Sequence, residues 1–374
     1  MPQDPWRKIR ALRAEPVEQA SEESRIANYQ GALAQAEELA EAARAAGYAS
    51  NALPLFYAVE QCGRAILEAR WPGQIHKLKG HGLSFGLARD PDHPNDLTKK
   101  DPNILRSLVA PRGNGSFQAV CEAIGSKPLA GPVALGALWM ANPDLRGAWI
   151  PDAVNEWQPP ITYGVGARET ARDEYGKQQD PESAWATTEG FVYIPVEMPG
   201  ETVKDVREIL QRYPTLGDAG VVVEGPAGHI IGTDDDTPVL RRYTYGGLKY
   251  VSVAKPVPRE MTMADFWAAQ DSMFSLVEVD DKAKSERGVP HWIGHALPRL
   301  GGGISPDPLM LWWAFLHGLS NLVRYHPGSW TAAINADSSI IADSLQRALD
   351  IAMEKLPERL VAAIVGDQGH RGRQ

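Results

Sequence analysis

The chain has 374 residues, of which 43% are hydrophobic, so it can bury a large core and fold as two or three units. Its formal net charge of −9 excludes a nucleic-acid binder that uses its whole surface, but leaves room for a local basic region. Two cysteines, Cys62 and Cys121, exclude a disulfide scaffold and a Cys-rich zinc module. With no secretory signal and no membrane-spanning apolar run, the sequence predicts a cytoplasmic protein without a membrane segment.

The first 150 residues are predicted to be mainly helical. An Ala- and Glu-rich stretch at 18–48 predicts one or two helices, and a longer helix is expected at 52–70. Short helices are expected at 116–125 and 130–141, and the proline-rich stretch at 72–115 is predicted to form loops.

The middle of the chain is predicted to be rich in strands. Strands are expected at 161–165, 190–197, 220–224, 229–232 and 247–254, with one helix at 202–213. The apolar runs on either side of the Gly/Pro-containing segment 224–228 predict a β-hairpin.

Helices are predicted again in the last part of the chain, at 261–273, at 307–325 and at 332–365, where one or two helices bend near Pro357. The fold class is therefore α+β and predominantly helical. We expect an N-terminal helical region (1–150), a β-rich middle (151–260) and a C-terminal helical region (261–374). In the simplest arrangement both chain ends form one helical domain and the middle is an insertion; three independent units are the alternative.

Several motifs resemble the YaaC-like family of bacterial proteins. They are the early Trp6 with Asn28-Tyr29-Gln30, the helix start at 52–57, Gly80-His81-Gly82-Leu83, and the segment 319–330 that contains Asn321, Arg324 and His326. The resemblance covers most of the chain except the β-rich middle. It implies no particular reaction and no particular catalytic residues.

A weaker likeness is to the HEPN helical domains, many of which are metal-independent RNases with an Arg followed after four to six residues by His. Arg70 and His76 have five residues between them. Trp71 stands where the family commonly has a polar residue, and Pro72-Gly73 interrupts the helix.

The predicted helix at 307–325 carries an unusual polar face. On a helical wheel one side holds Trp313, His317, Ser320, Asn321 and Arg324, without the Lys and Glu residues typical of a solvated face. This face can be a buried hydrogen-bonded network. Alternatively, it lines a ligand site in which Arg324 binds an anion and His317 or His326 transfers a proton.

The predicted helix at 52–70 has a second polar face, with Tyr57, Glu60, Gln61, Arg64 and Glu68. Pairs at i,i+4 would make it an ordinary exposed face; otherwise Glu60 and Arg64 face Arg324 across an inter-helix groove.

The stretch 61–115 is basic although the chain as a whole is acidic, because it has nine Lys and Arg residues and five acidic residues. It also contains His76, His81 and His93. It is our candidate for contacting phosphate in a nucleotide or RNA, the alternative being a solvated, loop-rich edge. His76, His81 and Arg64 are the candidate catalytic groups, because cleavage of RNA without metal needs a proton acceptor, a proton donor and a cation.

Metal and cofactor motifs are weak. His291 and His295 have i,i+4 spacing but lack the glutamate of a zinc helix, and Asp234-Asp235-Asp236 lacks the ligand pattern of an EF-hand. Gly301-Gly302-Gly303 fits neither a P-loop nor a dinucleotide fingerprint. We therefore expect no metal and no cofactor.

Three functions stay open. We favour a binding or regulatory module that holds a nucleotide or a protein partner, with His317, Asn321, Arg324 and His326 as ligand-binding residues. The second is an HEPN-like RNase or phosphodiesterase, and the third is a structural partner whose polar faces are internal networks.

Overall fold

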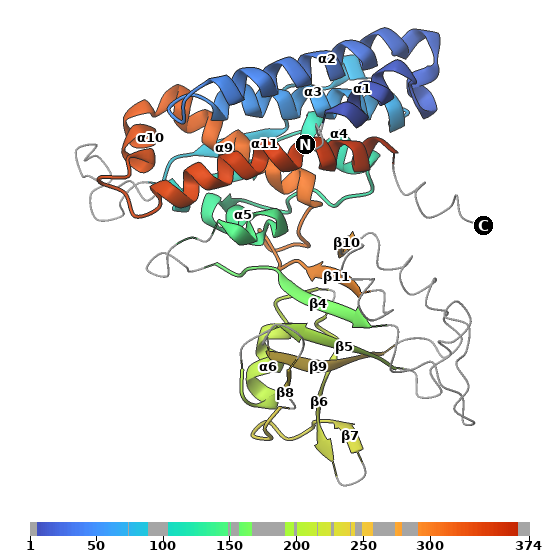
Figure 1. Ribbon diagram of the computed structural model, residues 1–374, viewed down its shortest axis with the longest axis vertical. Coiled ribbons are helices and arrows are strands. Elements are labelled where there is room, and N and C mark those ends of the chain that lie inside the picture. Colours follow the sequence, from blue (N-terminus) through green and yellow to red (C-terminus); the bar gives the residue numbers. More distant parts are fainter. Residues whose placement is uncertain are drawn as a thin grey trace. The chain divides into compact units, whose positions relative to one another are not determined.

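Figure 1 shows the fold of the chain as a computed structural model. The structure describes residues 6–73, 75–88, 104–148, 150, 157–166, 191–197, 200–214, 216–225, 228–239, 241–243, 249–256, 274–278 and 291–365. The chain divides into two compact units: the helical unit comprises Met1–Gln158 and Leu300–Gln374, and the β unit comprises Pro159–Arg299.

The helical unit contains most of the helices. Its N-terminal segments are α1 (Arg7–Ala14), η1 (Glu18–Ser21), α2 (Glu23–Ala45), α3 (Ala52–Arg70), η2 (Ile75–Lys77), η3 (Ile104–Arg106), α4 (Ser116–Ala123), α5 (Leu135–Ala141) and η4 (Pro143–Gly147). Its C-terminal segments are α9 (Pro308–Tyr325), α10 (Pro327–Ile334) and α11 (Ala342–Val365). A small antiparallel sheet in the order β1-β2-β3 completes it, from Leu83–Gly86, Leu108–Pro111 and Val133–Ala134.

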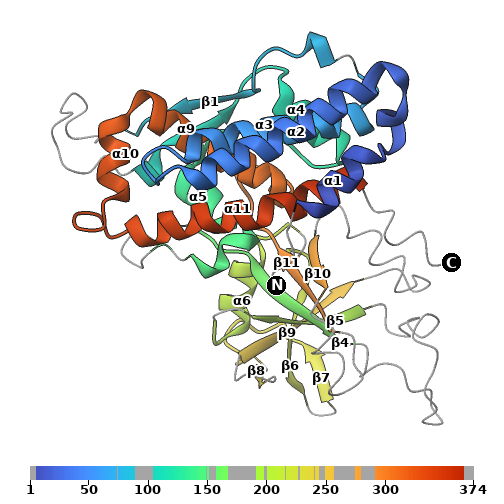
Figure 2. The same cartoon turned by 45° about the horizontal axis from the view of Figure 1, so that its top comes forward.

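Helix α9 is the central element of the helical unit. Asp307 caps its first turn by accepting a hydrogen bond from the Leu309 amide, and Pro308 occupies the first helical position, where its missing N–H costs nothing. Every residue from Pro308 to Ser320 is buried, as expected for a helix that is apolar on nearly all sides. Helices α3, α5, α10 and α11 and strands β1 and β2 pack around it, and Figures 1 and 2 show α3 and α9 side by side.

Helices α3 and α9 approach closely because Gly63 has no side chain. A Cβ atom at this position would lie 2.2 Å from the Trp313 ring, which is fully buried. The same pair of helices carries both polar faces that the sequence singled out.

In the part of the β unit that the structure describes, an antiparallel sheet has one helix packed on it. Among the described residues the strand order is β10-β11-β4-β5-β9-β6-β7, with β8 paired to β9. The strands are Ile161–Gly166 (β4), Phe191–Glu197 (β5), Gly220–Gly225 (β6), Gly228–Ile231 (β7), Arg241–Tyr243 (β8), Lys249–Pro256 (β9), Phe274–Glu278 (β10) and His291–Ala296 (β11). Helix α6 (Val203–Leu210) starts with a Thr202/Asp205 capping box and buries Val206 and Leu210 against Val221, Val251 and their neighbours.

The predominantly helical α+β class is confirmed, and so is the hairpin, as the antiparallel pair β6–β7. Other predictions need correction. The stretch 72–115 contains β1 and β2 as well as loops, and helix α1 was not predicted. Of the one or two helices expected at 332–365, the structure has two: α10, which already starts at Pro327, and α11, which contains Pro357 in its interior. The second unit boundary lies at 299/300 rather than 260/261, because β10 and β11 belong to the β unit. The predicted helix at 261–273 and His93 lie outside the described residues.

Candidate functional site

The Gly80-His81-Gly82 loop is held against the start of α4. Gly80 and Gly82 have φ angles of 67° and 78°, in the left-handed region that favours glycine. The backbone amides of Ser116 and Phe117 donate to the carbonyls of Gly80 and His81, so the loop also satisfies two amides at the start of the helix. A Cβ at Gly82 would lie 2.0 Å from Oε1 of Gln118, so only glycine fits this packing. These contacts give His81 a fixed backbone.

The His81 side chain is half-buried and contacts α3. Its ring meets Phe56 edge-on at a centroid distance of 5.4 Å, and its Nδ1 lies 2.8 Å from Oε1 of Glu60. Neither atom has another hydrogen-bond partner among the described residues, and the contact is an ion pair when the ring is protonated. The Glu60 carboxylate raises the pKa of His81, against the smaller opposing effects of burial and of Arg324.

His317 on α9 lies beside His81 but is almost completely buried, with 5% of its surface exposed. The two imidazole rings are 6.1 Å apart, and the edge of Phe56 contacts both. Nε2 of His317 lies 3.3 Å from the Asn321 side-chain nitrogen, and its buried Nδ1 has no hydrogen-bond partner among the described residues. Burial, with the nearby His81 and Arg324, lowers the pKa of His317 to about 4.

Arg324 places an exposed cation at the C-terminal end of α9. Its Nη1 donates to the Tyr57 hydroxyl at 3.3 Å and its Nη2 to the Tyr325 hydroxyl at 2.8 Å. Its Cζ lies 4.8 Å from the centroid of the Tyr325 ring, a cation–π distance. We call Glu60, His81, His317, Asn321 and Arg324 the histidine cluster.

Two exposed basic residues flank the His81 loop. The backbone amide of Lys79 donates to the Asn114 carbonyl and that of Arg112 to the Gly82 carbonyl, so both residues flank the His81 loop, and both are exposed. Glu60 is the acidic member of the cluster, and its side chain is 16% exposed. With a neutral His317, the charge of the cluster depends on whether His81 carries a proton.

Four of the residues singled out in the sequence are therefore brought together, namely His81, His317, Asn321 and Arg324, and three are not. His76 is exposed on η2, and Arg64 is exposed on α3, where its charge acts on Glu68. His326 packs near Phe85 at a ring distance of 6.1 Å. The helix spacing alone suggested that Glu60 pairs with Arg64, but Glu60 contacts His81 instead.

Arg70, the arginine of the HEPN-like spacing, makes contacts within the helical unit. Its Nη1 donates to the carbonyl of Ala363 in α11 at 2.9 Å, and its Nε lies 3.8 Å from Glu18. Arg70 thereby links the end of α3 to two other segments.

Sequence reasoning did not connect Glu60 with His81, and it gave Phe56 and Tyr57 no role in a site. Phe56 read as an ordinary core residue, and it is indeed buried. The available signal was the position of Tyr57 and Glu60 one turn apart on the polar face of α3, but nothing in that spacing shows which loop packs above it.

The alternative motifs give no site. Among the described residues no three His, Cys, Asp or Glu side chains are grouped so that they could hold a metal ion. Asp235 pairs with Arg207, while the side chains of His291 and His295 lie outside the described residues. Within the same part of the chain, no helix combines the length and apolarity needed to cross a membrane.

Comparison with known proteins gives one match. A family model described as YaaC-like Protein matches residues 3–173 and 286–364, and the unmatched segment between them lies in the β unit. No curated protein and no solved structure matches the chain significantly. The matched residues make up most of the chain and include every member of the histidine cluster, so the chain belongs to the YaaC-like protein family.

Proposed function

We propose that the protein is a binding module for a phosphate-bearing ligand such as a nucleotide, held at the histidine cluster. The observation that carries the proposal is the convergence of His81 and Arg324, which are far apart in the sequence, beside the exposed Lys79 and Arg112. A guanidinium and an imidazolium are donors suited to a phosphate group.

The local charge makes this site distinct from the rest of an acidic chain. The net charge of −9 repels an anion at long range, but screening reduces the effect of charges more than about 8 Å away at physiological ionic strength. At short range the ligand meets Arg324, whose orientation Tyr57 and Tyr325 support. A pre-oriented cation loses less side-chain entropy on binding than a free one.

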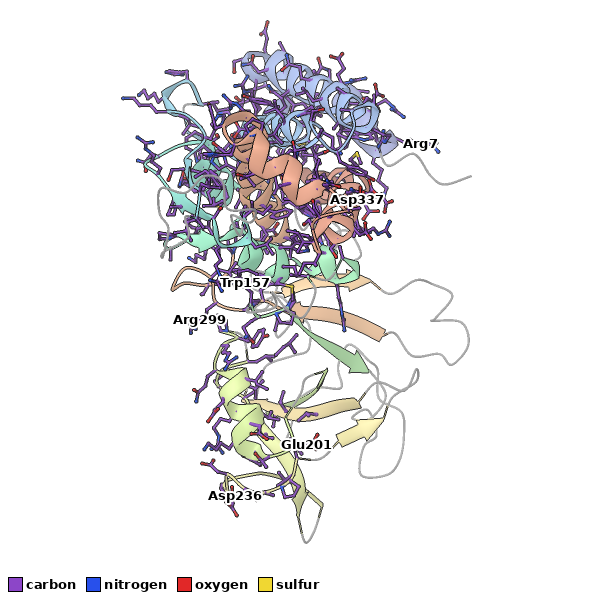
Figure 3. All side chains as sticks on the ribbon, turned by 90° about the vertical axis from the view of Figure 1, so that its left-hand side faces the viewer. Arg7, Trp157, Glu201, Asp236, Arg299 and Asp337 are labelled. Carbon is purple, nitrogen blue, oxygen red and sulfur yellow. The ribbon has the colours of Figure 1, made fainter. Side chains whose placement is uncertain are left out.

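The proposal is tested by calorimetric titration of the whole protein with inorganic phosphate and with a nucleoside monophosphate. We expect Arg324→Gln to weaken binding about 10- to 100-fold, the range for losing one charge-assisted hydrogen bond. Arg7→Gln is the matched control, since Arg7 is an exposed arginine at the outer side of the helical unit (Figure 3). Equal weakening by both variants, or no binding by the unchanged protein, would contradict the proposal.

Metal-independent cleavage of a phosphodiester is a second candidate function, favoured by the opposite pKa shifts of the two neighbouring histidines. At neutral pH His317 is unprotonated and could accept a proton, whereas the raised pKa of His81 suits a proton donor. Arg324 would stabilise the charge that develops on the phosphate. We place this function second because His317 is 5% exposed and must reach the substrate, whereas binding needs only the accessible groups.

Cleavage is tested by incubating the protein with a mixed RNA pool and a chelator, beside a His81→Ala variant. Cleavage by the unchanged protein that is lost in the variant is the expected result for an RNase. Equal cleavage in both, or none in either, excludes this function.

A further inference from the structure

The position of Glu60 has a consequence for any anion that binds at the histidine cluster. Its carboxylate is largely buried, lies 2.8 Å from Nδ1 of His81, and has no regular hydrogen bond to Oε1 among the described residues. A carboxylate beside an anion site opposes binding unless a proton compensates its charge. The nearest group able to hold that proton is His81.

We propose that Glu60 acts through His81 to couple anion binding at this site to the uptake of one proton. This inference rests on the proposed binding function. With His81 neutral, the charges of Glu60 and Arg324 cancel; with His81 protonated, the cluster carries one net positive charge. Protonation therefore both neutralises Glu60 and provides the ligand with a second cation. Since Nδ1 faces Glu60, Nε2 is the ring nitrogen left to donate to the ligand.

The groups around His81 support this assignment. Helix α3 presents Tyr57 and Glu60, and α9 presents His317 and Arg324. His317 does not compete for the proton, because its burial favours the neutral ring. The charged residues that flank the loop, Lys79 and Arg112, are exposed.

Glu60 is thus a positioning residue rather than a direct ligand. It holds the imidazole in one orientation and stabilises its protonated form, as a carboxylate does for a histidine in many sites. The edge contact with Phe56 fixes the ring from another side.

The test uses sulfate, a tetrahedral dianion that does not itself titrate between pH 5.5 and 8.5, unlike phosphate. Calorimetry in buffers of different ionisation enthalpy then measures the protons taken up per sulfate bound. We expect uptake approaching one proton above the pKa of His81, with affinity falling by up to about tenfold for each pH unit in that range. His81→Asn should abolish the uptake.

Glu60→Gln separates the proposed role from a merely structural one. Without the carboxylate the His81 pKa falls, so the midpoint of the pH profile moves to lower pH, and sulfate binds more tightly at pH 8 because a negative charge is gone. A structural role would weaken binding at every pH and leave the midpoint in place. Circular dichroism and thermal unfolding of each variant confirm that it folds.

The outcomes distinguish the two proposals. Sulfate binding with pH-independent affinity, or proton uptake that persists in His81→Asn, overturns the coupling and leaves the binding function standing. Absence of sulfate binding at a pH where phosphate binds overturns the coupling alone, and absence of binding of both anions at every pH overturns both proposals.

Discussion

Two polar groups on α9 differ in how completely their hydrogen bonds are satisfied. The first, near the start of the helix, joins η4, α9 and α11. Arg359 donates to the two carboxylate oxygens of Asp144 at 3.0 and 2.6 Å, and Nε1 of Trp312 donates to Asp144 at 2.9 Å. Burial alone would raise the pKa of Asp144, but Arg359 and Trp312 outweigh it and lower the pKa.

The second group, the histidine cluster toward the end of α9, is less completely satisfied. The buried Nδ1 of His317 has no partner among the described residues, and neither does Nε1 of the nearby Trp313. Oε1 of Glu60 and Nδ1 of His81 have no hydrogen-bond partner beyond their mutual contact among the described residues, and Arg324 is exposed. Buried polar groups are nearly always paired, so each exception needs an explanation.

The Asp144–Arg359 network and the histidine cluster therefore have different roles. A network whose donors and acceptors are matched within the protein stabilises the fold and has little left to offer a ligand. A network with unpaired donors or acceptors costs stability, but its accessible groups can bind a ligand. For the polar face that holds His317, Asn321 and Arg324, the sequence left both a buried network and a ligand site open, and the hydrogen bonds favour the ligand site.

The largest expected effect is at the satisfied network. Arg359→Met leaves the buried Asp144 charge unpaired and should lower the free energy of unfolding by about 3–5 kcal/mol. The measurement is urea unfolding followed by circular dichroism. Arg347→Met, an exposed position on the same helix, should change stability by less than about 0.5 kcal/mol. Equal losses would contradict a structural role for the Asp144–Arg359 pair.

The next effect concerns the contact between the helices that carry the cluster. Gly63→Ala places a methyl group against the buried Trp313 ring, and should destabilise the protein by about 2–3 kcal/mol. Gly31→Ala on α2 is the matched control, since a Cβ there meets nothing within 4 Å. Because alanine favours helix, the control should stabilise the protein by about 0.5–1 kcal/mol. A stabilising Gly63→Ala would show that the two helices are not in close contact there.

A smaller effect is expected from acid. The pKa of His317 is lowered in the folded protein, so its contribution to stability is complete above the ordinary histidine value of about 6.5 and is lost as the pH falls toward 4. Between pH 8 and pH 5 this loss is about 2 kcal/mol. In unfolding measurements over this pH range, the free energy of unfolding of His317→Gln should therefore fall by about 2 kcal/mol less than that of the unchanged protein. His81 has the opposite sign, because its raised pKa adds stability at low pH that is lost as the pH rises through it.

The smallest effect on stability is expected at Arg324. Arg324→Gln removes an exposed side chain and should change the free energy of unfolding by less than about 0.5 kcal/mol, while it weakens phosphate binding. This separation of stability from binding is the signature of a ligand site. A variant that unfolded at markedly lower urea concentration would place Arg324 with the structural network instead.

The sequence predicted most of the long elements, because their periodicity extends over many residues. Helix α9 begins and ends within a residue of its expected limits, since Pro308 and His326-Pro327 mark both ends. The short strands β1 and β2 were not predicted, because four residues each are too few for an alternating hydrophobic pattern to be recognised. The seven residues between α10 and α11 also contain no proline or glycine to mark a break.

The site was only partly predictable, because some of its contacts join segments that are distant in the sequence. The wheel of α9 identified His317, Asn321 and Arg324 because they share a helix, and the Gly-His-Gly motif identified His81. Nothing in the sequence links Glu60 with His81, because their contact depends on how a loop held by α4 packs on α3. His76 and Arg64 were singled out by residue type and local charge, which do not report position in space.

The central claim is that a phosphate group binds at His81 and Arg324. It is tested most directly by long-range ¹H–¹⁵N spectra of the histidine ring nitrogens during a titration with inorganic phosphate, with His81 assigned from the His81→Asn variant. We predict a saturable shift of the His81 ring nitrogens, largest at Nε2, which requires about 10- to 100-fold more phosphate in Arg324→Gln, while the resonances of the exposed His76 stay in place. Shifts at His76 with none at His81 would contradict it.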